Sequence, residues 1–261
     1  MTPWDPQQYQ RFSSERSRPF FDLLAQVPDD NVRYVADLGC GPGELTHSLL
    51  SRWPEATILG VDNSPDMLAA AARLPVHAQL QFVEADLATW RPDQPLDRIV
   101  SNAALQWVPD HASLLPHLVS LLAPQGVLAV QMPRNFDEPA HRLLAEVVRQ
   151  EPWASLLGSW RERFFVETPT WYIDTLDHLG LEVSLWETIY YHILTGPDAV
   201  LEWMKGSGLR PVLTRLSQDQ HEQFLSVYGA RLRAAYPVSS AGTLYPFRRP
   251  FFVARREEKA V

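Results

Sequence analysis

Residues 35–46 read Val35-Ala36-Asp37-Leu38-Gly39-Cys40-Gly41-Pro42-Gly43-Glu44-Leu45-Thr46, and their order predicts a strand, a turn and a helix. The strand is expected over the apolar residues 34–38, and the helix is expected to begin near Glu44. Glycine at every second position of the turn permits positive φ and lets a ligand approach the backbone closely. The helix that follows offers unsatisfied N–H groups. The pattern predicts a ligand-binding loop, with a purely structural turn as the alternative.

The loop differs from the phosphate-binding loop of dinucleotide enzymes. Their fingerprint is G-x-G-x-x-G, but Glu44 stands where its third glycine would be. Asp37, just before the first glycine, would repel a phosphate, whereas it would attract a ligand with a positive amino group. Both features argue against a nicotinamide-dependent oxidoreductase.

Composition indicates an ordinary globular protein. With 261 residues, 46% hydrophobic and 21% charged, the chain suits one domain with an insertion, or a domain with a small cap. It contains no apolar run long enough for a membrane span, and it begins with neither a basic nor an apolar leader segment, so we expect a cytoplasmic protein. The net charge of −8 argues against broad nucleic-acid binding. A single cysteine, Cys40, and scattered histidines predict neither a disulfide framework nor a metal site.

Apolar runs that alternate with helical patterns predict the fold class. We expect an α/β protein with a doubly wound, seven-stranded, mostly parallel, Rossmann-like sheet and right-handed crossovers. After the first strand, the others are expected at residues 57–61, 80–87, 96–101, 127–132, 181–194 and 250–255.

Polar residues follow several of these strands, at the edge of a parallel sheet where ligands bind. Asp62 ends the second strand, about 20 residues past the glycine turn, where an acid can accept both hydroxyls of a ribose. A simple turn acid is the alternative. Asn102 and Trp107 follow the fourth strand and are expected to face the reacting centre, although Trp107 also suits a core position.

The run Asp-Leu-Gly-Cys-Gly-Pro-Gly at 37–43 resembles the nucleotide loop of class I S-adenosylmethionine-dependent methyltransferases, whose ligand carries an ammonium and a sulfonium but no phosphate. Segments outside the loop resemble the trans-aconitate 2-methyltransferase family, and the chain departs from it around 150–168. These segments are Trp4-Asp5-Pro6, residues 14–19, Ser101-Asn102-Ala103-Ala104-Leu105-Gln106-Trp107, residues 117–122, Tyr190-Tyr191-His192, Gly208-Leu209-Arg210-Pro211 and residues 251–256.

The resemblance implies an S-adenosylmethionine-dependent O-methyltransferase. It implies esterification of a carboxylate of trans-aconitate, which gives a monomethyl ester and S-adenosylhomocysteine. Asp86 is expected to accept a hydrogen bond from the adenine amine, with the Leu87 N–H beside it, or else to cap a turn. Met67 is expected either to line the adenine pocket or to fill core. The full set of expected cofactor-binding residues is Asp37, Gly39, Cys40, Gly41, Gly43, Asp62, Asn63, Met67, Asp86, Leu87, Asn102, Ala103 and Trp107.

Such a reaction needs no general base, because a carboxylate with a pKa of about 4 is already ionised at neutral pH. We therefore expect positioning residues and no catalytic side chain. The two remaining carboxylates of a tricarboxylate require local positive charge, which arginine supplies through bidentate pairs. A surface ion pair is the alternative for each arginine. The expected substrate-binding residues are Arg16, Arg18, Tyr190, His192, Arg210 and Arg248 or Arg249. Because side chains alternate along a strand, Tyr191 should face away from Tyr190 and His192.

The expected organisation has three parts: an N-terminal helical lid at 1–30, an α/β core at 31–194 and 250–261, and a helical cap at 195–249 over the substrate site. One alternative function is a methyltransferase of the same fold that acts on another small acid, or on a carrier-bound or fatty acid through an apolar channel. Another is a non-catalytic cofactor-binding module. The oligomeric state is left open, with a monomer preferred.

Overall fold

The computed structural model describes residues 13–158, 164–206 and 208–256. Within them the chain forms two compact units. The larger unit comprises Arg16–Pro133, Phe164–Thr188 and the described part of Pro250–Val261. The smaller unit comprises the described parts of Met1–Glu15, Arg134–Arg163 and Ile189–Arg249. Sequence analysis assigned residues 134–158 and 189–194 to the α/β core, whereas their contacts group them with the smaller unit.

One sheet of eight strands runs through the described residues. Its strands are β1 (Tyr34–Leu38), β2 (Thr57–Asp62), β3 (Leu80–Glu84), β4 (Leu96–Asn102), β5 (Leu122–Gln131), β6 (Leu181–Leu194), β7 (Val238–Ser239) and β8 (Gly242–Arg256). Their order is β3-β2-β1-β4-β5-β8-β6, with β7 paired to β8. The first five strands pair in parallel, and β8 is antiparallel to β5. The predicted doubly wound, mostly parallel sheet is confirmed, with eight strands where seven were expected, because the two-residue strand β7 pairs with β8.

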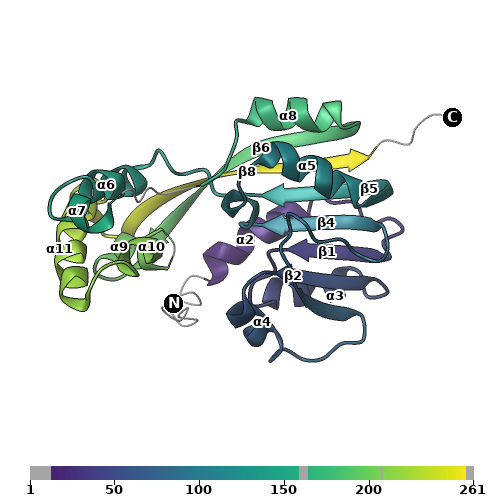
Figure 1. Cartoon of the computed structure of the whole chain (residues 1–261), viewed down its shortest axis with the longest axis horizontal. Helices are drawn as coiled ribbons and strands as arrows, with labels where there is room; N and C mark the ends of the chain where they lie inside the picture. The colour runs from purple at the N-terminus through teal and green to yellow at the C-terminus, as the bar shows by residue number, and fades with distance from the viewer. Residues whose placement is uncertain (1–12, 159–163, 207, 257–261) are drawn as a thin grey trace. The chain divides into compact units, whose positions relative to one another are not determined.

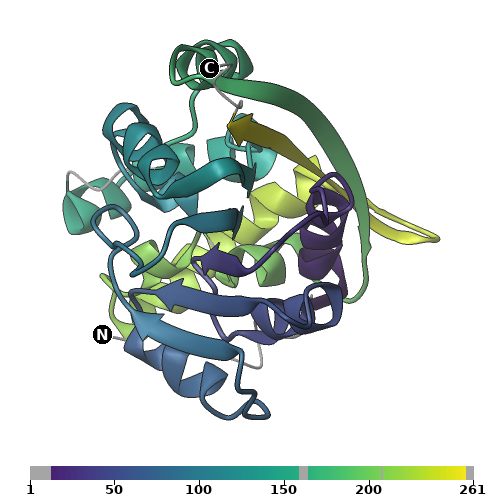
Figure 2. The ribbon, with the colours of Figure 1, turned by 90° about the vertical axis from the view of Figure 1, so that its right-hand side faces the viewer.

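Helices cover both faces of the sheet in the larger unit. Figure 2 shows α5 on one face and α2 and α3 on the other. In this unit the helices are α2 (Ser13–Leu24), α3 (Glu44–Arg52), α4 (Pro65–Ala71), the 3₁₀ turn η1 (Leu105–Trp107), α5 (His111–Ser120) and α8 (Pro169–His178). The smaller unit contains α6 (Pro139–Val148), α7 (Trp153–Leu157), α9 (Ala199–Lys205), α10 (Arg210–Leu213) and α11 (Gln218–Ala235), all labelled in Figure 1.

The core of the larger unit follows from its apolar strands. In β4, Leu96, Ile99 and Val100 are fully buried, as parallel strands covered on both faces require. Leu115 of α5 and Leu176 of α8 pack against one face of the sheet. In α2, the predicted inward side chains Phe20, Leu23 and Leu24 are buried, together with Val27 beyond it.

The smaller unit is built around α11. Tyr228 donates a hydrogen bond from its hydroxyl to the Ala140 carbonyl at 2.8 Å, which joins α11 to α6. The Tyr236 hydroxyl accepts one from the Ala140 N–H at 3.0 Å. At the start of α11, the Ser217 N–H donates to Gln220 at 2.8 Å, as the capping-box pattern predicted.

The segment predicted as a helical cap at 195–249 also contains strand. β7 and the first half of β8 lie within it, so β8 begins at Gly242 and not at Pro250. Thr243, Tyr245, Phe247 and Arg249 are buried at alternate positions, which is the signature of a strand. Prolines 246 and 250 interrupt this pattern in the sequence and concealed it.

Two other strand boundaries differ from the prediction by more than one residue. β3 ends at Glu84, before Asp86, and β5 begins five residues earlier than expected, at Leu122.

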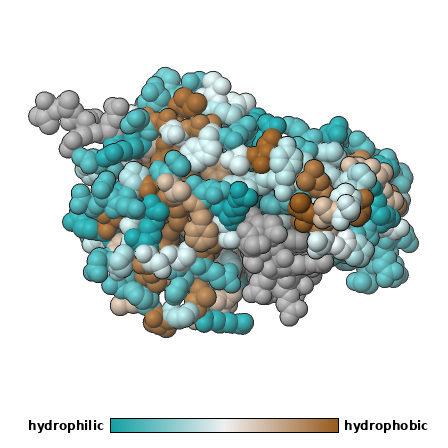
Figure 3. All heavy atoms as spheres, turned by 180° about the vertical axis from the view of Figure 1, so that it is seen from behind, coloured by the Kyte–Doolittle hydropathy of each residue, from teal (hydrophilic) through white to brown (hydrophobic). Residues whose placement is uncertain are grey.

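On the face drawn in Figure 3, hydrophilic residues surround smaller patches of hydrophobic ones. In the described part of the chain, every helix is too short or too polar to cross a membrane.

Candidate functional site

The glycine loop joins β1 to α3 at the carboxyl edge of the parallel strands. Gly39, Gly41 and Gly43 have φ angles of 76°, 56° and 83°, as the spacing predicted. The Gly39 N–H donates to the Val61 carbonyl of β2 at 2.8 Å. A Cβ on Gly39 would lie only 2.1 Å from that of Ala104, so no larger residue fits there. The loop therefore lies directly against the segment that follows β4.

Cys40 lies in the same loop with its side chain buried. Its Sγ donates to the Gly41 carbonyl at 3.7 Å. Burial, with the negative charges of Asp37 and Asp62, raises the pKa of the thiol far above its ordinary value. The thiolate is the reactive form of cysteine, so burial holds Cys40 as an unreactive thiol at neutral pH, and its contact with the cofactor stays a prediction.

Asp62 connects the loop to the end of β2. Its Oδ2 accepts a hydrogen bond from the Gly41 N–H, and its Oδ1 accepts one from the Ser64 N–H, both at 2.9 Å. The side chain is half-buried. A carboxylate has about four acceptor sites, so it can accept further hydrogen bonds from a ligand. Asp62 is thus held in place by the backbone with acceptor capacity to spare.

Asp37 is buried beneath the glycine loop. It accepts a hydrogen bond from Thr46 Oγ1 at 2.6 Å, and Thr46 is itself fully buried. Burial raises the pKa of Asp37 to about 6; the Thr46 hydrogen bond opposes this shift and the nearby Asp62 charge adds to it. The site therefore holds a desolvated carboxylate that a positive group would stabilise.

Asp37→Asn is expected to stabilise the ligand-free protein at neutral pH. Between pH 3.8 and about 6, the folded chain retains a proton on Asp37 that the unfolded chain has lost. The stability contribution of this group therefore falls as the pH rises through that window. Asparagine does not ionise, so the stability of the variant does not fall with pH in this way. Above pH 6, its free energy of unfolding should exceed that of the parent by up to about 3 kcal/mol. Urea unfolding from pH 4 to pH 7 measures the difference, and a gap that does not shrink towards pH 4 would contradict the assignment.

The start of α4 forms another side of the site. Ser64 accepts the Met67 N–H at 3.4 Å as the N-cap, as predicted. Met67 is half-buried and Asn63 is exposed. Sequence analysis missed Phe82 of β3, whose ring would lie 2.6 Å from a Cβ on either Gly43 or Gly60. No sequence signal marked Phe82, because its neighbours come from other strands and from the loop.

Asp86 lies in the turn after β3. Its Oδ1 accepts the Ala88 N–H at 2.9 Å, so the turn-capping alternative describes this structure. The side chain is exposed and the neighbouring Leu87 is half-buried. The capping bond leaves acceptor capacity on the carboxylate, and a contact with a ligand amine stays a prediction.

Asn102 ends β4 next to Gln131 of β5. Its Oδ1 is buried and has no hydrogen-bond partner among the described residues. Ala103 follows with φ of 55°, a left-handed value that is uncommon for a residue with a side chain. A buried, unpaired acceptor costs free energy unless a ligand donor satisfies it. Asn102 is thus a strong candidate for ligand contact.

Trp107 is 51% exposed, so the structure excludes the core role that the sequence left open. Its ring lies 4.9 Å from that of Phe164. A buried network that the sequence did not reveal joins the neighbouring elements: His111 Nδ1 lies 2.6 Å from the Tyr172 hydroxyl, and His111 Nε2 lies 2.9 Å from the Leu105 carbonyl. Both contacts join segments far apart in the chain or on different elements.

The predicted substrate arginines of the N-terminal helix and of α10 are only partly described. Arg18 is exposed and its Nε lies 3.7 Å from an Asp22 carboxylate oxygen, which matches the surface ion-pair alternative. The side chains of Arg16 and Arg210 lie outside the described residues.

The remaining substrate candidates lie in the smaller unit. Tyr190 and His192 are buried on one side of β6, while Tyr191 is 63% exposed, which confirms the predicted alternation. His192 stacks on Trp203 with centroids 5.0 Å apart. The Arg249 side chain is buried, with its guanidinium 4.4 Å from the Phe247 ring centroid. Arg248 is half-buried. Aromatic rings, histidine and arginine thus share one end of the β6–β8 pair.

Among the described residues, no group of three or more histidine, cysteine, aspartate or glutamate side chains is placed to hold a metal ion.

Comparison with known proteins identifies the family. Residues 35–126 match the model of the methyltransferase domain. The chain is 50% identical over 262 aligned residues to trans-aconitate 2-methyltransferase of Streptomyces avermitilis, covering 97% of each chain. It is 47% identical to the enzyme of that name from Azoarcus sp., covering 98% of this chain and 100% of that one.

Solved structures share the fold at low sequence identity. Phosphoethanolamine N-methyltransferase 2 of Haemonchus contortus, in complex with S-adenosyl-L-methionine, has a TM-score of 0.55 and 17% identity, covering 92% of this chain and 53% of that one. The YcgJ protein of Bacillus subtilis has a TM-score of 0.57 and 12% identity, covering 92% and 99%. With the near full-length similarity to the two trans-aconitate enzymes, these findings show that the chain belongs to the trans-aconitate 2-methyltransferase family and has the class I methyltransferase fold.

Proposed function

We propose that this protein transfers a methyl group from S-adenosylmethionine to a carboxylate of trans-aconitate, producing the monomethyl ester and S-adenosylhomocysteine. The observation that carries this proposal is the similarity, over nearly the whole chain, to enzymes named for that reaction. The site geometry supports it independently, because all three glycines of the predicted cofactor loop have the positive φ angles that the loop requires.

The residues of the carboxyl edge suit S-adenosylmethionine. The left-handed glycines of the loop allow close approach to the backbone, and Asp62 keeps acceptor capacity for ribose hydroxyls. Two features suit a ligand that carries positive charge and N–H donors: the buried carboxylate of Asp37 and the unpaired Oδ1 of Asn102. Asp37→Asn should therefore weaken cofactor binding while it stabilises the ligand-free protein.

The chemistry requires positioning more than proton transfer. When bound, the cofactor supplies an electrophilic methyl group on its sulfonium. The acceptor carboxylate is already ionised at neutral pH, so the chain needs to align an oxygen with that methyl group and to exclude water from both charges. Trp107 and Phe164 present aromatic surface suited to excluding water. No side chain is assigned as an acid or a base.

The spectator carboxylates require cations. We infer that they are held by arginines drawn from Arg16, Arg18, Arg210 and Arg249, assisted by Tyr190 and His192. Among these arginines, Arg249 is the one whose side chain is buried. A buried guanidinium forms a stronger charge-assisted pair with a carboxylate than an exposed one does, which favours Arg249. The roles of residues 1–30 as a lid and of 195–249 as a cap stay predictions, as does the cytoplasmic location.

Transfer of a labelled methyl group to a panel of acids tests the proposal. The panel contains trans-aconitate, cis-aconitate, citrate, isocitrate and a long-chain fatty acid. We expect strong preference for trans-aconitate. Transfer to the fatty acid alone would preserve the cofactor assignment and overturn the polycarboxylate one. Absence of transfer to every acid, with the cofactor still bound, would favour a non-catalytic binding module.

Arg210→Ala is expected to raise KM for the acid about tenfold or more, with little change in cofactor affinity, because one charge-assisted hydrogen-bond pair is lost. Arg215→Ala is the matched control, since the Arg215 side chain is exposed nearby and, within the described residues, donates to the Pro211 carbonyl at 3.0 Å. Steady-state kinetics with both variants measures the effect. An unchanged KM in Arg210→Ala would remove Arg210 from the substrate site.

A further inference from the structure

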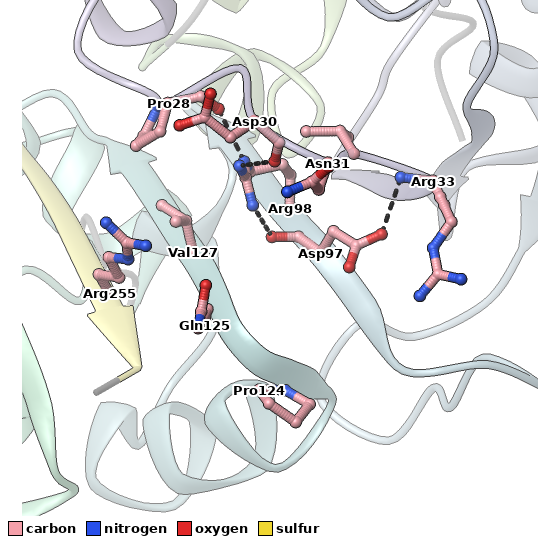
Figure 4. A pocket seen from close by; sticks show the side chains of 11 residues that line it. Pro28, Asp30, Asn31, Arg33, Asp97, Arg98, Pro124, Gln125, Val127 and Arg255 are labelled. Atoms are coloured by element: carbon pink, nitrogen blue, oxygen red, sulfur yellow. Dashed lines mark hydrogen bonds between the residues drawn. The ribbon is translucent and has the colours of Figure 1, made fainter. Parts of the chain in front are cut away.

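A polar pocket lies in the larger unit at the amino edge of the sheet, opposite the glycine loop. Its volume is about 520 Å³. β1 and β4 begin beside it, and β8 ends there. The residues around it are Pro28, Asp30, Asn31, Val32, Arg33, Asp97, Arg98, Pro124, Gln125, Val127 and Arg255, drawn in Figure 4. β1 spans five residues between this edge and the loop, so the two sites are roughly 15 Å apart.

Arg98 is the most buried charged group of this pocket, with 5% of its surface exposed. Its Nε donates to the Pro28 carbonyl at 2.9 Å, its Nη2 to Asp30 at 3.0 Å and its Nη1 to Asp97 at 2.7 Å. All three acceptors are neutral backbone carbonyls. The hydrogen bonds are the dashed lines at Arg98 in Figure 4. Guanidinium carries five N–H groups and three of them are used here, so Arg98 retains donors. Its charge forms no ion pair within the described residues, although the carboxylates of Asp97, Asp30 and Asp29 act on it electrostatically.

The nearby acids are occupied elsewhere or exposed. Asp97 Oδ2 accepts the N–H groups of Arg33 and Tyr34 at 2.8 and 2.9 Å, which holds the start of β1. Asp29 forms an ion pair with Arg52 at 2.7 Å. Asp30 is exposed. None of these carboxylates forms an ion pair with Arg98 among the described residues.

A second cation faces the same pocket. The Arg255 backbone pairs with β5, but its exposed side chain forms neither a hydrogen bond nor an ion pair within the described part of the chain. Burial lowers the pKa of Arg98, and the positive charge of Arg255 adds to this shift, while the carboxylates of Asp97, Asp30 and Asp29 oppose it. Figure 4 shows Arg255 and Gln125 on one side of Arg98 and the Asp97 carboxylate on the other. Two like charges around one cavity repel each other unless an anion lies between them.

We propose that this amino-edge pocket binds a small multivalent oxyanion between Arg98 and Arg255, with Gln125 as a further donor. Each guanidinium can pair bidentately with a carboxylate or with a phosphate. The chemistry that is recognised is a compact cluster of anionic oxygens. The bound anion would cross-link the starts of β4 and β5 to the end of β8 and so stabilise the folded chain.

Amide proton–nitrogen NMR spectra of the full-length protein test the proposal, with inorganic phosphate and citrate as probes and chloride at matched ionic strength as the reference. We expect saturable shifts of the Asn31, Asp97 and Gln125 amides. Arg255→Gln should weaken the affinity about tenfold, as loss of one charge-assisted pair predicts. Arg73→Gln is the matched control, because Arg73 is exposed outside the pocket and has the same charge.

The local amides separate this site from the acceptor site, where citrate could also bind. Saturation by one probe alone would support the pocket and identify its ligand as a carboxylate or a phosphate. The proposal would be overturned if neither probe shifted these amides beyond the chloride reference, or if Arg255→Gln bound as tightly as Arg73→Gln.

Discussion

Gly39→Ala is expected to destabilise the folded protein by about 3 kcal/mol and to abolish binding of S-adenosylmethionine. The new methyl group would lie 2.1 Å from the Ala104 Cβ, and φ of 76° is strained for any residue with a side chain. The loop or the segment after β4 must then move, and both carry residues predicted to bind the cofactor. Chemical denaturation and calorimetric titration of the cofactor measure the two effects.

Two further variants separate the clash from the backbone strain. Gly41 has φ of 56°, and a Cβ there would meet nothing within 4 Å. Gly41→Ala therefore introduces backbone strain without a clash, and it should destabilise the protein by about 1 kcal/mol. Adding Ala104→Gly to Gly39→Ala removes the clashing Cβ and should restore much of the lost stability. If Gly39→Ala were no worse than Gly41→Ala, the close approach of residues 103–104 would not be a determinant of the site.

Asp62→Ala is expected to weaken cofactor binding at least about 100-fold, which in most assays is a complete loss. Asp62 would accept both ribose hydroxyls, and each hydrogen bond to a charged group contributes about 1.5–3 kcal/mol. The variant also removes the acceptor of the Gly41 and Ser64 N–H groups, so the loop loses its link to β2. Calorimetric titration measures the affinity, and far-ultraviolet circular dichroism confirms that the chain is folded.

Asp66→Ala is the matched control for this experiment. Asp66 is an exposed acid in the first turn of α4, four residues from Asp62, and it carries the same charge. Its replacement should leave cofactor affinity nearly unchanged. A folded Asp62→Ala variant that binds the cofactor as well as Asp66→Ala does would exclude Asp62 as the ribose ligand.

The elements that the sequence predicted well are those whose signal is local. β1 and β6 have their expected bounds, because an apolar run between turn residues needs no distant partner to be recognised. The left-handed glycines at 39, 41 and 43 follow from spacing alone. The end of β3 and the start of β8 were misjudged, because strand ends depend on pairing with neighbours far along the chain.

Contacts between distant segments account for what sequence analysis missed. Phe82 packs against Gly43 and Gly60, and Trp107 packs against Phe164. Neither Phe82 nor Phe164 belongs to a motif whose spacing marks such a contact. The amino-edge pocket is a further case, since its arginines come from strands that the sequence separates widely.

The sequence by itself determined the fold class, the family, the ligand loop and the acids at its rim, because parallel strands place their carboxyl ends at one edge whatever lies between them. The tertiary structure alone decided the environment of each group. Burial raises the pKa of Asp37 to about 6 despite the Thr46 hydrogen bond, and Ala104 leaves no room at position 39. Arg98 donates to Pro28 from 70 residues away. Desolvation and close packing depend on every atom that surrounds a group, and most of those atoms come from elsewhere in the chain.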